Sequence, residues 1–269
     1  MSGYHIFENP AEGFQFYIDR LLEQGSPVMP RGAPTYELVD EHMVFKWPNA
    51  IIQTEGRNWK FGIAAVEALS LVGQCSIPEQ LTKRFKVFDA FVDEGALWGA
   101  YGPRIAGDLG QCVKTLQNDH FSRQAVLTIF DSNRDLNRNG VNDVPCTIAI
   151  QFMIRDGQVN MRVIMRSNDI WLGYPYDTIQ FFALQSALAQ CFGLPVGTYS
   201  HLVGSLHLYL RDLARAESMR YQPPVTRVFK PPFWAGQTIG EISSRAREIL
   251  MGDHLGDTEF ERWLAAQIA

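Results

Sequence analysis

The chain has 269 residues, 46% of them apolar, which is enough for one large domain or two small ones. Its net charge of −5 excludes a general nucleic-acid footprint, so a phosphate ligand has to be held by a local cluster of cations. It has no run of 18 apolar residues and no signal-peptide pattern, so we expect a cytoplasmic protein without membrane contact. The four cysteines lack C-x-x-C spacing and are expected to be reduced thiols.

The first part of the chain mixes helical and extended patterns. Helical spacing of apolar residues predicts a helix over residues 10–25, and a Pro/Gly-rich loop carrying Arg31 follows it. Residues 35–48 alternate in the manner of one or two strands. An apolar run over residues 60–73 predicts a buried helix with a single acid, Glu67, in an apolar setting.

The middle of the chain predicts two further helices, over residues 77–94 and 107–119, and then a strand over residues 122–130. The polar stretch 131–143 is expected to be a loop. It leads into two strand-like runs joined by the Asp-Gly dipeptide at 156–157, which is a strong signal for a β-hairpin.

The last third predicts a helix over residues 176–194, an apolar strand over 198–212, and helices over 239–252 and 258–268. Strands and helices are mixed without a regular alternation of strand and crossover helix. This order favours an α+β fold with a mixed or mostly antiparallel sheet, in one domain over residues 1–269.

Cys146 follows a Val-Pro pair at the start of a predicted strand. One interpretation is a structural cysteine in the core, where most free cysteines lie. The other is a nucleophile, whose thiol pKa would be lowered if the fold brings Arg123 and Arg166 close to it.

Arg166 and Ser167 stand at the end of a predicted strand. They either form its polar end or clamp a phosphate through a guanidinium fork and a hydroxyl. Arg31 and Arg123 would add charge to such a clamp. The chain has neither a glycine-rich phosphate loop nor a dinucleotide fingerprint, so scattered arginines suit a mononucleotide better than a triphosphate.

His207 and Tyr209 alternate along a predicted strand and should project from the same face, with His201 at the same parity. They are either satisfied core residues or a pair that binds a sugar hydroxyl. No set of His, Cys and carboxylate residues has metal-ligand spacing, so we expect no metal.

Several segments together resemble the thymidylate synthase family over roughly residues 12 to 212. They are, in chain order, FYIDRLLEQG, VEALSLVG, LWGAYGPR, SRQAVLTIF, VPCTIAIQF, MRSNDIWLGYPYD and LAQCFGLPVGTYSHLVGSLHLY. The resemblance implies a three-layer fold in which helices pack on a mixed sheet. It also implies an obligate homodimer, with one face of the sheet as the interface.

The resemblance also implies roles for individual residues. Cys146 matches the nucleophile that adds to C6 of the pyrimidine, and Glu67 matches the acid that organises water and moves protons. Tyr101 matches a tyrosine beside the cysteine, and Gln151 lies on the strand behind the base. The implied co-substrate is 5,10-methylenetetrahydrofolate, with Asp169 contacting both the base and the folate.

The phosphate ligands implied by the resemblance are Arg31, Arg166 and Ser167, together with Arg123 from the partner subunit. The pair His207 and Tyr209 matches the residues that bind the 3′-hydroxyl.

Some positions depart from the family pattern. The second arginine after Ser122 is replaced by Gln124, and the usual histidine after the cysteine is Thr147. The aromatic folate wall is assigned to Phe88 and Phe91. An apolar C-terminal lid motif is not visible in RWLAAQIA.

Asp177 stands where the family pattern has asparagine. An asparagine amide complements O4 and N3–H of uracil, whereas a protonated carboxyl complements N4–H₂ and N3 of cytosine. Apolar neighbours should raise the Asp177 pKa and keep a proton available. Asparagine replaced by aspartate also marks the deoxycytidylate-modifying branch of the family, which this chain resembles more closely than ordinary thymidylate synthases. The other interpretation is a neutral replacement in a uridylate enzyme.

The resemblance therefore implies 5-hydroxymethylation of dCMP for the biosynthesis of modified cytosine. Methylation of dCMP with formation of dihydrofolate, a thymidylate synthase that uses dUMP and a CMP hydroxymethylase remain alternatives. A non-catalytic nucleotide-binding protein is disfavoured, because Cys146 and Glu67 are both retained. A cysteine hydrolase would need a histidine base beside Cys146, with His201 and His207 as the candidates.

Overall fold

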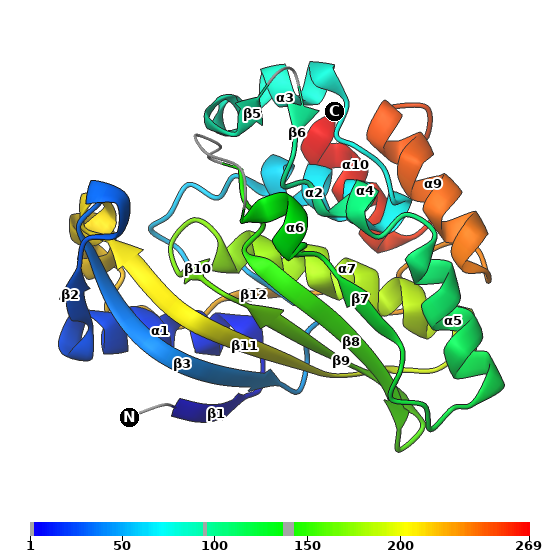
Figure 1. Cartoon of the computed structure of the whole chain (residues 1–269), viewed down its shortest axis with the longest axis horizontal. Helices are drawn as coiled ribbons and strands as arrows, with labels where there is room; N and C mark the ends of the chain where they lie inside the picture. The colour runs from blue at the N-terminus through cyan, green and yellow to red at the C-terminus, as the bar shows by residue number, and fades with distance from the viewer. Residues whose placement is uncertain (1–2, 94–95, 137–142) are drawn as a thin grey trace.

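The computed structural model describes residues 3–93, 96–136 and 143–269, and at its centre is a mixed eight-stranded sheet (Figure 1). The main path runs β1-β3-β11-β9-β8-β7, with β2 paired to β3 and β10 paired to β11. The strands of this sheet are β1 (Gly3–Phe7), β2 (Ser26–Val28), β3 (Thr35–Phe45), β7 (Val126–Thr128), β8 (Thr147–Arg155), β9 (Gln158–Met165), β10 (Asn168–Asp169) and β11 (Val196–Tyr209). Its pairs are both parallel and antiparallel, and the β8–β9 hairpin is present as predicted.

Helices cover one face of the sheet in two further layers. The longer helices are α1 (Pro10–Gln24), α2 (Phe61–Gly73), α5 (Asp108–Asn118), α7 (Tyr174–Phe192), α9 (Ile239–Met251) and α10 (Glu259–Ile268). Most side chains of α7 are buried, because it lies between the sheet and the outer helices α2, α9 and α10 (Figure 1). The predicted α+β class with helices packed on a mixed sheet is confirmed.

Shorter elements connect this frame. They are the helices α3 (Glu79–Arg84), α4 (Tyr101–Arg104), α6 (Ser132–Asp135) and α8 (Leu213–Ser218), the 3₁₀ turns η1 (Pro30–Gly32), η2 (Lys86–Ala90) and η3 (Leu210–Asp212), and the strand pairs β4 (Ala50–Ile52) with β12 (Thr226–Val228) and β5 (Val92–Asp93) with β6 (Ala96–Leu97).

Local sequence signals explain the main element boundaries. Asn9 caps α1 by accepting from the amides of Ala11 and Glu12, which leaves two otherwise unpaired N–H groups satisfied. The hairpin turn places Asp156 at φ 51° and Gly157 at φ 68°, as a type I′ turn requires. These devices act over a few residues, so the sequence pattern was sufficient to locate α1 and the β8–β9 hairpin.

The strand ends beside the helices are irregular. The register of β8 against β9 shifts between Thr147 and Ala149. On β11, a Cβ at Gly204 would lie 2.9 Å from the carbonyl oxygen of Arg166, so glycine is needed for this close approach. The start of β8 and the end of β9 therefore lie beside Gly204 of β11, where the loop residues 143–146 enter the sheet.

Four predicted segments differ from the structure. The helix expected over residues 77–94 ends at Arg84, and η2 and β5 follow. Residues 122–130 contain only the short strand β7, and the loop after α1 contains β2 and η1. The expected loop 131–143 begins with α6, and its residues 137–142 lie outside the described residues.

The break after α3 has a tertiary cause. Phe85 leaves the helical region at φ −99° and ψ 86°, and its ring packs so closely on Gly62 of α2 that a Cβ there would lie 2.5 Å from it. Packing between distant segments therefore overrides the local helical pattern.

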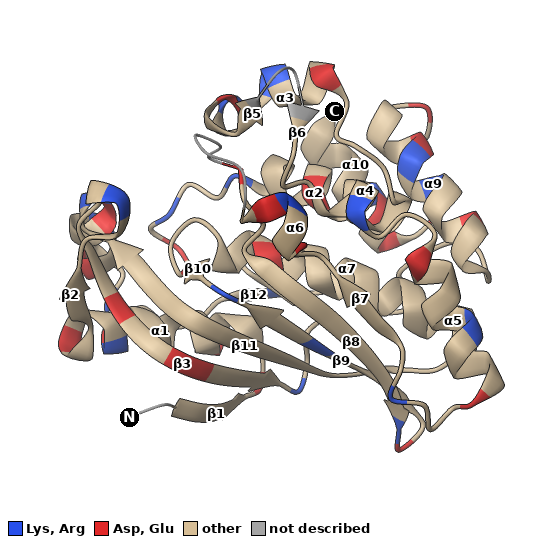
Figure 2. Cartoon of the chain, in the orientation of Figure 1, with Lys and Arg blue, Asp and Glu red and all other residues tan. Residues whose placement is uncertain are grey.

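Charges and apolar groups are distributed unevenly. Basic and acidic residues are interspersed over the outer elements, whereas α7 carries a single charged residue, Asp177 (Figure 2). Exposed apolar side chains occur on the strands, among them Ile6, Val39 and Ile164. No helix within the described ranges is long and apolar enough to span a bilayer.

Candidate functional site

A cavity of about 810 Å³ opens where the strand ends meet α2, the segment 84–102 and the start of α7. This volume lies within the range of small-molecule binding sites. Its lining includes most of the residues that the sequence singled out: Arg31, Glu67, Phe88, Phe91, Tyr101, Cys146, Arg166, Ser167, Asp169, Asp177, His207 and Tyr209. The fold thus collects into one cavity residues that are up to 178 positions apart, from Arg31 to Tyr209.

Cys146 and Arg166 lie side by side in the cavity. Arg166 Nη2 lies 3.7 Å from Cys146 Sγ, and its Nε and Nη2 donate to the carbonyls of Pro145 and Val144, each at 2.9 Å. Burial raises the pKa of the Cys146 thiol above its usual value, while Arg166 opposes this effect. The lowering expected from a nearby arginine is present for Arg166, but burial outweighs it and the net shift of the Cys146 pKa is upward.

Asp177 lies in the first turn of α7 and is held through both carboxyl oxygens. Asn168 Nδ2 donates to Oδ2 and Gln180 Nε2 donates to Oδ1, each at 2.6 Å. Desolvation by burial raises the Asp177 pKa to about 7, although both amide contacts act in the opposite direction. The predicted rise of this pKa is confirmed, and both protonation states are accessible near neutral pH.

Glu67 projects from α2 into the same cavity. Burial and the nearby carboxylates of Asp177 and Asp143 raise its pKa to about 8. Tyr101 lines the cavity beside it, and both the backbone N–H and the hydroxyl of Thr147 donate to the Tyr101 hydroxyl, at 3.3 and 3.1 Å. Thr147, the residue in place of the family histidine, therefore positions Tyr101 next to Cys146.

Asp169, His207 and Tyr209 meet because β10 and β11 pair in parallel, with Asp169 opposite His207. Asp169 Oδ1 accepts from the backbone N–H groups of Trp171 and Leu172, at 2.8 and 3.2 Å. Burial raises the Asp169 pKa, and the neighbouring His207 acts against this shift. His201 is fully buried and does not line the cavity, although it alternates along the strand in step with His207.

One wall of the cavity is apolar. Phe88 is buried and Phe91 is 40% exposed, and Phe85, which the sequence analysis did not single out, joins them.

The sequence analysis also missed four cations that line the cavity: Lys60, Arg84, Lys86 and Arg211. Arg211 lies over the ring of Tyr209 at 4.1 Å, and its position two residues beyond the His-x-Tyr motif was the available signal.

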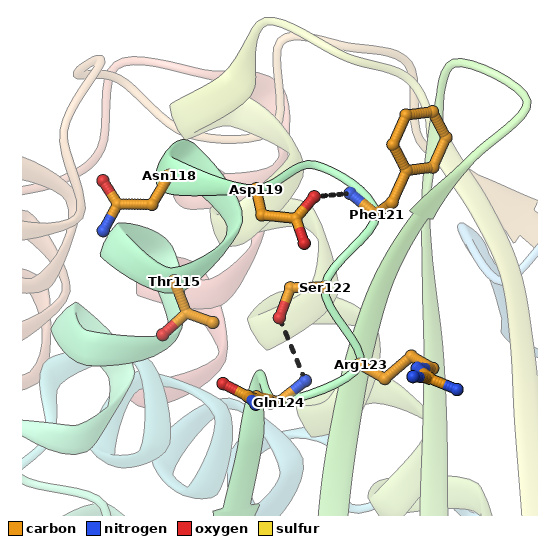
Figure 3. Close-up of a pocket in the computed structure, with 7 residues that line it drawn as sticks. All are labelled: Thr115, Asn118, Asp119, Phe121, Ser122, Arg123 and Gln124. Carbon is orange, nitrogen blue, oxygen red and sulfur yellow. Dashed lines mark hydrogen bonds between the residues drawn. The ribbon is translucent and has the colours of Figure 1, made fainter.

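Two predicted ligands lie elsewhere in this chain. Arg123 is exposed beside a second hollow of about 400 Å³ between the end of α5 and β7, and its guanidinium points away from Thr115 and Asn118 (Figure 3). Gln151 does not line the main cavity but donates from Nε2 to the Arg123 carbonyl at 2.9 Å.

Two amides that contact Asp177 were also missed by the sequence analysis. Asn168 lies inside the Arg-Ser-Asn-Asp motif and Gln180 one helical turn after Asp177, so their spacing was visible but their contacts were not. Within the described part of the chain, no group of three or more His, Cys, Asp or Glu side chains is arranged to hold a metal ion.

The fold and this site define a protein whose cavity holds a cysteine thiol, a guanidinium beside it and buried carboxyl groups. Residues 12–228 match the family model described as thymidylate synthase, and the chain belongs to the thymidylate synthase family.

Two phage proteins are similar to it. The deoxyuridylate hydroxymethyltransferase of Bacillus phage SP01 is 29% identical over 221 residues, which cover 74% of this chain and 57% of the relative. The deoxyuridylate hydroxymethyltransferase of Pseudomonas phage M6 is 28% identical over 182 residues, covering 64% of this chain and 52% of the relative. The chain spans about half the length of these curated relatives.

Proposed function

We propose that this protein transfers a one-carbon unit to C5 of a pyrimidine 2′-deoxynucleotide monophosphate, with dCMP as substrate and 5-hydroxymethyl-dCMP as product. The observation that carries the choice of base is Asp177, a carboxyl with a pKa of about 7 in the cavity that holds Cys146. The names of the two phage relatives support hydroxymethylation over methylation.

The Asp177 carboxyl complements the Watson–Crick edge of cytosine. One oxygen accepts from N4–H₂, and the protonated oxygen donates to N3. Uracil presents an acceptor, O4, and a donor, N3–H, so it would pair only with the carboxyl proton moved to the other oxygen, and the carboxylate form leaves O4 without a donor. Each mispaired buried polar group costs about 1–3 kcal/mol of binding free energy, so a mispaired base would bind on the order of tenfold to a hundredfold more weakly.

Cys146 and Asp177 act together in the first step. The Cys146 thiolate forms a bond to C6, the electrons of the C5–C6 double bond move toward C5, and Asp177 gives its proton to N3. Arg166 stabilises the thiolate before the attack. C5 then bonds to the one-carbon group and loses its proton, and the bond from that carbon to its donor breaks, so that the donor leaves. Water adds its hydroxyl to this carbon, the C5–C6 double bond re-forms as the C6–S bond breaks, and Asp177 takes its proton back from N3.

The co-substrate we propose is 5,10-methylenetetrahydrofolate, which supplies a one-carbon group at the oxidation level of formaldehyde. The cavity fits such a molecule, because Phe85, Phe88 and Phe91 offer an apolar surface to a flat ring and Asp169 offers a hydrogen-bond acceptor. Glu67 holds the water whose hydroxyl becomes part of the product. The Glu67 carboxylate takes up the proton that this water loses, as the Glu67 pKa of about 8 permits.

Phosphate and sugar ligands complete the proposal. Arg31, Arg166 and Ser167 lie in the cavity and bind the phosphate, and His207 with Tyr209 binds the 3′-hydroxyl. Arg123 is exposed outside this cavity, which fits a contribution to the site of a second subunit in a homodimer.

A second candidate is the same hydroxymethylation with dUMP. It is favoured by the names of both phage relatives, which state deoxyuridylate. It would require Asp177 to pair with uracil through a water or an altered protonation state.

The test is mass spectrometry of the products from dCMP, dUMP and CMP, each incubated with 5,10-methylenetetrahydrofolate. A gain of about 30 Da on dCMP, the mass of CH₂O, is expected; a gain of about 14 Da would mean methylation. Cys146→Ser serves as the inactive control. Turnover of dUMP without turnover of dCMP would refute the assignment of Asp177.

A further inference from the structure

A line of buried polar residues leads away from the cavity behind Asp177. Tyr199 Oη lies 2.5 Å from His201 Nδ1, and His201 Nε2 lies 3.1 Å from Asn168 Oδ1. Asn168 Nδ2 in turn donates to Asp177 Oδ2 at 2.6 Å. Tyr199 and His201 are fully buried and Asn168 is 2% exposed, so water does not compete for these contacts. We call Tyr199, His201 and Asn168 the Asp177 relay.

The relay has a defined direction. Burial lowers the His201 pKa to about 3, so the imidazole is neutral and carries one N–H. Asn168 presents its carbonyl oxygen to His201, so His201 Nε2 is the donor and its Nδ1 accepts from the Tyr199 hydroxyl. The Asn168 carbonyl is occupied in this way, and only its NH₂ group is left to face Asp177.

This direction matters for the proton of Asp177. A primary amide has nearly the same shape after a half-turn, so an unconstrained Asn168 would present its carbonyl to a protonated Asp177 and capture the proton. The relay prevents this exchange. Because Gln180 donates to the other oxygen of Asp177, both protein-side contacts of the carboxyl are N–H donors.

We propose that Asn168, oriented by His201 and Tyr199, is a positioning residue that keeps the Asp177 proton directed at the bound pyrimidine. The substrate in this inference rests on the proposed function, whereas the orientation of Asn168 and its effect on Asp177 concern the free protein. The ionisable groups that interact with Asp177 from the surrounding elements are Glu67 of α2, Tyr101 of α4, Cys146 before β8, Asp169 of β10 and Tyr199 of β11.

The test is a ¹³C-carboxyl NMR titration of Asp177 in the full-length free protein, with Asp177→Asn for assignment. Asn168→Leu removes the donor and should raise the Asp177 pKa by about one to two units, the equivalent of a hydrogen bond to a charged group. His201→Leu frees the amide to turn its carbonyl to the protonated acid and should also raise this pKa. His201→Gln retains a donor for Asn168 and should restore the wild-type value.

A matched control comes from the same helix as Asp177. Gln185 is a fully buried amide that donates to the carbonyls of Val159, Gly197 and Thr198, away from the cavity. Gln185→Leu should destabilise the fold without moving the Asp177 pKa. A ¹⁵N spectrum of the His201 ring should show the proton on Nε2.

The outcomes separate the two proposals. If the Asp177 pKa is the same in wild type, His201→Leu and His201→Gln, the relay is overturned, whichever nucleotide the protein uses. These two His201 variants decide the matter even if Asn168→Leu does not fold. If the pKa moves as expected but the wild type binds dUMP more tightly than dCMP by calorimetry, the proposed base preference fails and the positioning role stands. If both hold, His201→Leu should reduce kcat with dCMP at least tenfold and shift its pH profile, and His201→Gln should recover both.

Discussion

Arg166 Nη2 lies 3.7 Å from Cys146 Sγ and also donates to the carbonyl of Val144, while Arg166 Nε donates to the carbonyl of Pro145. This contact places a positive charge beside the Cys146 thiol. It is also the main force that opposes the effect of burial on the Cys146 pKa.

Replacing Arg166 should therefore suppress the thiolate. In Arg166→Gln the Cys146 pKa rises further, so alkylation of Cys146 by iodoacetamide, followed by peptide mass spectrometry, should slow and move to higher pH. Arg155→Gln is the control, because Arg155 donates to backbone carbonyls and lies over the Phe121 ring, and it does not line the cavity. An unchanged pH profile of alkylation in Arg166→Gln would argue against thiol activation by this arginine.

Asp177→Asn should exchange the preferred base. The amide complements uracil, so turnover of dUMP should rise and turnover of dCMP should fall, each on the order of tenfold to a hundredfold in kcat/KM. The control is Thr178→Val on the same helix, since the Thr178 hydroxyl donates within the helix to the carbonyl of Pro175. If the variant keeps the wild-type preference, Asp177 does not select the base.

Glu67 and Asp177 should make stability depend on pH. Their pKa values of about 8 and about 7 lie above the values near 4 expected in the unfolded chain, so the folded state keeps protons that the unfolded state has lost. Their contribution to stability is full below about pH 4 and is lost as the pH rises toward 8.

Urea unfolding at pH 5, 6.5 and 8 measures this effect. The wild type should lose stability over this range, and Glu67→Gln should lose less, because its amide does not titrate. The exposed substitution Glu217→Gln should follow the wild type. Parallel curves for wild type and Glu67→Gln would show that the Glu67 pKa is not raised.

Arg123 should act on the cavity of a second subunit. If so, mixing Cys146→Ser with Arg123→Glu should restore activity that neither variant has alone, up to about a quarter of the wild-type value for random dimers with one intact site. The control mixture is Cys146→Ser with Arg166→Glu. Both residues belong to the cavity of their own subunit, so every cavity of a mixed dimer keeps one defect and no activity returns. Absence of recovery in the first mixture, with dimers verified by light scattering, would remove Arg123 from the site.

The sequence located the longer helices and strands and placed most of its candidate residues in one cavity, but it failed where distant segments interact. The residues 77–94 have a helical pattern, yet Phe85 breaks it by packing on Gly62 of α2. His201 and His207 share strand parity, yet one is in the core and the other in the cavity. Spacing along a strand shows which residues alternate, but not what lies against them.

The sequence by itself determined the chemical inventory of this protein. Short-range periodicity, turns and motif spacing were enough to indicate an α+β chain with a cysteine, several arginines and a carboxyl at Asp177, because these signals depend on neighbours within a few residues. Tertiary structure alone decided how these groups behave. Burial raises the pKa of Cys146, and the fold brings His201 to Asn168 across 33 positions. Neither could be predicted from local sequence, because desolvation and hydrogen bonding depend on which distant groups share the same space.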